Sequence, residues 1–135
     1  MLKPWLATKP RLGKAGLHFY HFDNTGNVEM KAIEAVPALA ALAQEHRLAI
    51  YRLLVQAGPD GMAAGEIAEK LGLPASSLSF HLAHLTRSGM IVQRRESRSL
   101  IYSADFDRMN ALVGFLTENC CGGRSCAPVS KARRA

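Results

Sequence analysis

The hydrophobic period of the chain changes at Gly89, and no other sequence feature restricts the possible folds as strongly. Before Gly89, apolar side chains recur at helical spacing. The first helix that this spacing predicts begins at Met30, and three more lie near residues 45–57, 63–71 and 74–88. Gly-Pro-Asp-Gly at 58–61 predicts a turn after the second helix, and Gly72 suits the end of the third. The N-terminal part of the domain is therefore expected to be helical.

After Gly89 the pattern favours short strands. Residues 90–94 and 99–102 are strand-like runs around the charged segment 95–98, which predicts a hairpin with a charged tip. A last helix is expected near 105–119, with one apolar face. This order of elements is mainly α with a small β-hairpin wing, and it predicts a winged helix-turn-helix.

In such a fold the helix that follows Pro74 would enter the major groove of DNA, and the hairpin would lie beside it. Hydroxyl groups bond phosphates or base edges, and arginines bind backbone phosphates or the minor groove. The candidate DNA-binding residues are Ser76, Ser77, Ser79, Phe80 and His81 of the helix and Arg94, Arg95 and Arg98 of the hairpin. The alternatives are that the serines cap the helix, that His81 packs in the core, and that the arginines form a solvated face.

Size and charge agree with a single DNA-binding domain. The 135 residues are 48% apolar, which is enough for one core, and the net charge of +6 favours a polyanionic partner. Residues 1–29 are expected to be a flexible arm, which is not native if Met30 is the true start. Residues 30–119 form the predicted domain, and 120–135 a cysteine segment and basic tail. With no signal peptide and no apolar run of about 18 residues, we expect a cytoplasmic protein with reduced thiols and no membrane partner.

All three cysteines, Cys120, Cys121 and Cys126, lie within seven residues. Thiolates grouped in this way suit a soft metal or metalloid, and As(III) or Sb(III) takes three of them. Adjacent cysteines point about 100° apart on an intact helix, so both reach one ion only where the helix ends. Gly122 and Gly123 permit that ending. Other thiophilic inducers (methylated arsenic, cadmium or lead), a thiol-oxidation or persulfide switch, and incidental cysteines remain open.

Three segments together resemble the ArsR/SmtB family of metal-responsive repressors. They are LAQEHRLAIYRLL (42–54), LPASSLSFHLAHLTRSGMI (73–91) and RRESRSLIY (94–102). The resemblance implies a homodimer joined through its first and last helices, binding to an inverted-repeat operator, and release from DNA when an inducer binds. The third helix lacks the cysteines of well-known arsenic-sensing members, and the last lacks the paired Asp/His pattern of the zinc sites. A C-terminal cysteine pair resembles the arsenite-responsive branch instead.

Taken together, the sequence predicts a repressor that binds double-stranded operator DNA as a homodimer and is released by As(III) or Sb(III). No organic cofactor is expected. No Cys-x-x-Cys motif, phosphate-binding loop or acid pair suggests an enzyme. A repressor of the same fold that senses thiol oxidation or persulfide is the first alternative, and a metallochaperone without DNA binding is the second.

Overall fold

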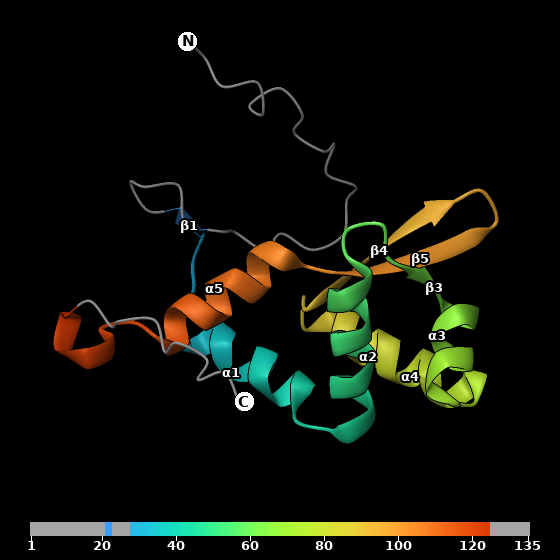
Figure 1. Ribbon diagram of the computed structural model, residues 1–135, viewed down its shortest axis with the longest axis horizontal. Helices are drawn as coiled ribbons and strands as arrows, with labels where there is room; N and C mark the ends of the chain where they lie inside the picture. The colour runs from blue at the N-terminus through green and yellow to red at the C-terminus, as the bar shows by residue number, and fades with distance from the viewer. Residues whose placement is uncertain (1–20, 23–27, 125–135) are drawn as a thin grey trace, which may run out of the picture.

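The computed structural model describes residues 21–22 and 28–124 (Figure 1). Its helices are α1 (Ala32–Leu42), α2 (Glu45–Ala57), α3 (Ala64–Leu71), α4 (Ala75–Arg87) and α5 (Phe106–Leu116), with a short 3-10 helix, η2, at Cys120–Gly123. Its strands are β1 (His21–Phe22), β2 (Val28–Glu29), β3 (Met62–Ala63), β4 (Ile91–Glu96) and β5 (Ser99–Ala104). The mainly helical fold with a hairpin wing is the one that the sequence predicts.

The core lies where α2, α3 and α4 pack against one another and against the base of the hairpin. Its largest fully buried side chains are Ile50, Leu54, Ile67, Leu78, Leu82, Leu85, Met90 and Ile91. These residues come from the stripes at helical spacing and from the start of the first strand-like run. Burial of these apolar side chains is the main stabilising contribution to the domain.

Local signals set the ends of the helices where the sequence places them. Gln44 accepts a hydrogen bond from the Arg47 backbone N–H at 2.9 Å and so caps α2, which ends at Gly58 with a φ of 78°. Gly72 ends α3 in the left-handed conformation. The side chain of Arg47 donates to the carbonyl of Ala41 at 2.6 Å, so it ties the end of α1 to the start of α2.

The wing is a three-stranded antiparallel sheet in the order β3-β5-β4. Strand β3 was not predicted from the sequence, because two residues carry no periodicity. Gly61 lets β3 approach β5: a Cβ there would overlap the Tyr102 carbonyl oxygen, and the φ of Gly61 is 70°. Arg94 and Arg95 pair with Ile101 and Leu100, so the charged tip predicted at 95–98 is shorter than expected.

The end of the last predicted helix needs correction. The last helix ends at Leu116, three residues before the predicted end, because the backbone leaves the helical conformation at Thr117, with a φ of −103° and a ψ of 5°. Within the predicted arm, β1 and β2 form a small antiparallel pair, and β2 packs against α5. None of the helices in the described ranges is long and apolar enough to span a membrane.

Candidate nucleic-acid interface and cysteine segment

Helix α4 presents a polar face opposite the side that packs into the core. Leu78, Leu82 and Leu85 are buried, whereas Ser76, Ser77, Ser79 and Phe80 are exposed. Pro74 occupies the N-cap position and the cap lacks a side-chain hydrogen bond, so the serines do not cap the helix. The Ser79 hydroxyl donates to the Ala75 carbonyl at 2.9 Å, which leaves its oxygen lone pairs directed away from the helix.

His81 lies on the side of α4 that faces α2, and it is partly buried. Its ring centroid is 5.4 Å from that of His46 and 6.0 Å from that of Phe80. Burial lowers the pKa of His81, and the neighbouring His46, Arg47 and His84 lower it further. His81 is therefore partly covered by side chains from α2, and its contact with DNA stays a prediction.

The three wing arginines have different surroundings. The Arg94 guanidinium donates to a Glu96 carboxylate oxygen at 2.8 Å and to the carbonyls of Pro59 and Asp60. It thus ties the wing to the turn that follows α2. Arg95 and Arg98 are exposed, Arg95 on β4 and Arg98 in the turn between the strands. The geometry favours Arg95 and Arg98 over Arg94 for contact with phosphates.

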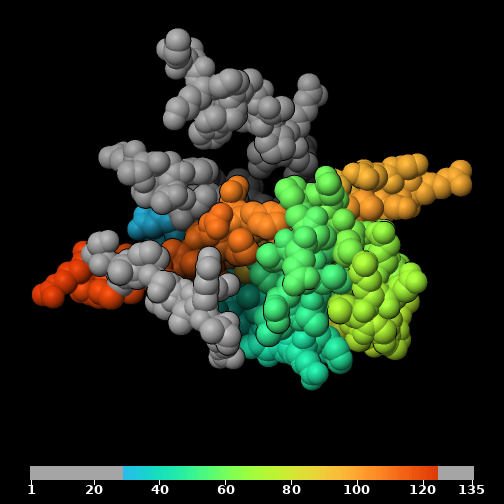
Figure 2. Space-filling view, in the orientation of Figure 1, coloured from blue at the N-terminus to red at the C-terminus, as the bar shows by residue number. Residues whose placement is uncertain are grey.

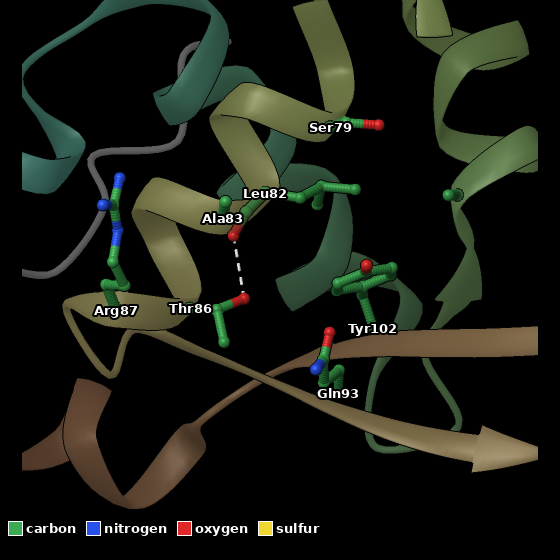
Figure 3. Close-up of a pocket in the computed structure, with 8 residues that line it drawn as sticks. Ser79, Leu82, Ala83, Thr86, Arg87, Gln93 and Tyr102 are labelled. Atoms are coloured by element: carbon green, nitrogen blue, oxygen red, sulfur yellow. Dashed lines mark hydrogen bonds between the residues drawn. The ribbon is translucent and has the colours of Figure 1, made fainter. Parts of the chain in front are cut away.

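A pocket of about 310 Å³ separates α4 from the wing (Figure 3). Gln93 of β4 and Tyr102 of β5 lie on its wing side, and Ser79 and Thr86 lie on α4. Its other lining residues are Ala64, Leu82, Ala83 and Arg87. Neither Gln93 nor Arg87 was among the residues predicted to bind DNA. Helical spacing could have found Arg87, because nine residues from Leu78 at 100° per residue place it about opposite the core.

The cysteine segment follows the end of α5 directly. Cys120 and Cys121 are exposed in η2, and their Sγ atoms lie 3.7 Å apart. Positive φ angles at Asn119, Cys121 and Gly122 reverse the chain here, so the expected helix ending before the cysteines is present. Cys121 forms a disulfide. Cys126 lies outside the described residues, within which no cluster of three or more potential metal ligands occurs.

Large apolar side chains are exposed along α1 and α5, which lie next to each other in Figure 1. We call this surface the apolar patch. Its members are Ile33 (81% exposed), Val36, Leu39, Val113 and Leu116. The side of α1 that packs inward is instead made of Ala35, Ala38 and Ala41. A helix that buries alanines and exposes its largest apolar residues is typical of an interface between protein chains.

Comparison with known proteins gives the class of this molecule. Residues 42–94 match the helix-turn-helix domain family. The transcriptional activator HlyU of Vibrio cholerae is 32% identical over 73% of this chain and 88% of its own length. The transcriptional repressor BigR of Xylella fastidiosa is 27% identical, with a TM-score of 0.52 over 67% of this chain and 89% of BigR.

A homodimeric winged helix-turn-helix domain of Mycobacterium bovis, a possible ArsR-family regulator, is 26% identical, with a TM-score of 0.51 over 71% of this chain and 89% of that one. The fold and these relatives define a winged helix-turn-helix transcriptional regulator, not an enzyme. The chain belongs to the ArsR-type family that includes HlyU. The predicted fold and family are thereby confirmed, whereas the arsenite branch stays a prediction.

Proposed function

We propose that the protein is a repressor that binds operator DNA as a homodimer and leaves it when As(III) or Sb(III) binds Cys120, Cys121 and Cys126. The observation that carries this proposal is the 3.7 Å separation of the Cys120 and Cys121 sulfurs at the end of α5. Two thiolates about 2.3 Å from one tetrahedral ion lie about 3.8 Å apart, and slightly closer around a pyramidal ion. This separation is seen with Cys121 in a disulfide, and it would suit a shared ion once Cys121 is reduced to a thiolate.

The backbone around the cysteines supports a third thiolate. Gly122 and Gly123 both have positive φ angles, which cost glycine nothing and which place the chain in a reversal. Two residues separate Gly123 from Cys126 along the sequence, a short enough distance for the Cys126 thiol to reach the same ion. Three thiolates would neutralise a trivalent centre, whereas zinc usually takes four ligands.

The DNA-binding part of the proposal rests on α4 and the wing. Exposed hydroxyls on α4 and exposed Arg95 and Arg98 on the wing can bond base edges and phosphates. Gln93 and Arg87 line the pocket between α4 and the wing, and they offer further hydrogen-bond donors. Because the net charge is +6, binding should weaken steeply as salt rises.

The homodimer part rests on the apolar patch. A twofold dimer uses the same surface on both chains, and a patch formed by α1 and α5 would pair with its own copy. Two recognition helices related in this way would lie about 34 Å apart, one turn of DNA. The homodimeric neighbour from Mycobacterium bovis supports this assembly for the present chain.

Arg108 of α5 is the residue through which the two sites would communicate. Its guanidinium is buried, and it donates to the Glu34 carbonyl of α1 at 3.4 Å. It also lies against Gly89, where a Cβ would come within 3.2 Å of its Nε atom. Gly89 follows α4, so a shift of α5 would move both the apolar patch and the end of the recognition helix. Couplings of this kind are typically about 1–3 kcal/mol.

The binding of arsenite to the reduced protein tests the thiol site. Arsenic–thiolate bonds absorb in the ultraviolet, so a titration should saturate at one arsenite per chain. Replacing Cys120, Cys121 or Cys126 with serine should each weaken binding strongly. Thr117→Ala changes a nearby polar residue without removing a thiol, so this control should bind as the wild type does. Arsenite binding by the serine variants as tight as that of the wild type would refute the three-thiolate site.

The disulfide at Cys121 favours a second candidate, a repressor released by thiol oxidation. Formation of a disulfide removes two electrons and two protons from a pair of thiols, which an oxidant must accept. A mild peroxide treatment in the absence of arsenite would then release DNA, and a thiol reductant would restore binding. The metallochaperone alternative is disfavoured, because carrying an ion requires neither α4 nor the wing.

A further inference from the structure

Phe80 is an exposed aromatic residue on α4, the proposed recognition helix. It is 63% exposed, whereas Leu78 and Leu82 of the same helix are 2% exposed. Two residues beyond Leu78 at 100° per residue, Phe80 points about 200° away from it, which is nearly opposite the core. An exposed phenyl group at that position does not help to hold the domain together.

The residues around Phe80 make its ring protrude and limit its movement. Ser76 and Ser77, one turn before it, and Ala83, one turn after it, are small and exposed. The ring meets His81 edge-on, with the centroids 6.0 Å apart and the planes at 71°. His81 in turn packs against His46 of α2, so the ring that Phe80 contacts is itself held in place.

The charge of this helix indicates what the phenyl group contacts. Helix α4 contains no acidic residue, and its last turn carries His84 and Arg87. The apolar patch that suits a second protein chain lies elsewhere, on α1 and α5. A helix without acidic residues that presents one protruding apolar ring fits the major groove, in which the C5-methyl group of thymine is the apolar feature.

We propose that Phe80 reads thymine in the operator by packing its ring against the C5-methyl group. This inference rests on the proposed binding of operator DNA and adds a base preference to it. The serines alone discriminate poorly, because a hydroxyl both donates and accepts and so bonds to either kind of base edge. The phenyl group would disfavour cytosine, which has no methyl group, at the same position.

The test uses the full-length reduced protein and two versions of its own promoter fragment, one with thymine and one with deoxyuridine in every thymine position. Uracil keeps the hydrogen-bonding groups of thymine and lacks only the methyl group. Loss of one buried methyl-sized group weakens binding about fourfold, so two half-sites with one contact each give about sixteenfold. The wild type should show this preference for thymine.

Variants of Phe80 assign the preference to the ring. Phe80→Ala should bind both fragments equally, and Phe80→Leu should retain part of the preference, because leucine still offers an apolar surface. Leu48→Ala changes another exposed apolar residue, 44% exposed on α2, and should keep the full preference. Circular dichroism checks that each variant is folded.

Three results would overturn the proposal. Equal binding of both fragments by the wild type would show that no thymine methyl group is read, while operator binding itself would stand. A full preference in a folded Phe80→Ala variant would assign the reading to another residue. Failure of the wild type to bind its promoter at all would refute the proposed function, and the reading of thymine with it.

Discussion

Replacement of Ile33 by alanine should dissociate the proposed dimer without unfolding the domain. Ile33 is the most exposed member of the apolar patch, at 81%, so it contributes little to the core of one chain. The change removes three side-chain carbons, each worth about 0.8 kcal/mol when buried. Scaled by the exposure, the loss is about 2 kcal/mol per chain, or about 4 kcal/mol for the two copies in a symmetric dimer.

A loss of about 4 kcal/mol raises the dimer dissociation constant about a thousandfold. Sedimentation velocity over a range of protein concentrations measures that constant. Leu48→Ala is the matched control, because Leu48 is exposed but lies on α2, outside the patch. An Ile33→Ala variant that dimerises as tightly as the wild type would refute the assignment of the patch to the dimer interface.

Four further changes have definite expected results. Gly61→Ala should lower the free energy of unfolding by about 2 kcal/mol or more in urea titrations, because a positive φ costs about 1–2 kcal/mol and the new Cβ meets the backbone of β5. Tyr51→Phe should raise it by about 1 kcal/mol, because the buried hydroxyl lacks a hydrogen-bond partner in the described part of the chain and burial raises the pKa of Tyr51 to about 12. Burial and the neighbouring His46 lower the pKa of His81 in the folded chain. The unfolded chain therefore binds more protons at this position than the folded chain does. Stability should therefore fall as pH drops below about 6.5, and fall less in His81→Gln. Arg98→Ala should weaken binding to all DNA sequences and reduce the salt slope by about one unit, which anisotropy titrations at several salt concentrations would measure.

The helical part of the fold could be predicted because strong local signals agree with one another. Leu78, Leu82 and Leu85 repeat at helical spacing, and Pro74 and Gly89 mark the limits of their helix. Strand β3 could not be predicted in the same way. Its two residues pair with β5 only because Gly61 permits a close approach, and that approach depends on contacts between segments distant in sequence.

The apolar stripe on α1 shows a second limit of sequence reasoning. Ile33, Val36 and Leu39 have the spacing of a core stripe, and periodicity does not distinguish a core from an interface. The structure separates the two uses, because Ala38 of the same helix is buried and Ile33 is exposed. The alanines of α1 were a weak indication of which side packs inward, because small residues let a helix pack closely on the domain.

The candidate site was also only partly visible in the sequence. Residue type and order pointed to the exposed serines of α4, whereas the different roles of Arg94 and Arg98 required the structure. Arg94 is engaged by carbonyl oxygens from a turn 34 and 35 residues earlier in the chain. No local pattern records such a contact, so sequence reasoning treated the wing arginines alike.

The measurement that tests the central claim most directly is the fluorescence anisotropy of labelled promoter DNA bound to the reduced protein, titrated in parallel with arsenite and zinc. We predict that arsenite releases the DNA at near-stoichiometric amounts and that zinc does not release it. Cys121→Ser should bind the DNA normally and resist arsenite. DNA binding that arsenite leaves unchanged in the wild type would contradict the metalloid switch, and release by mild oxidation alone would then identify the thiol-redox repressor.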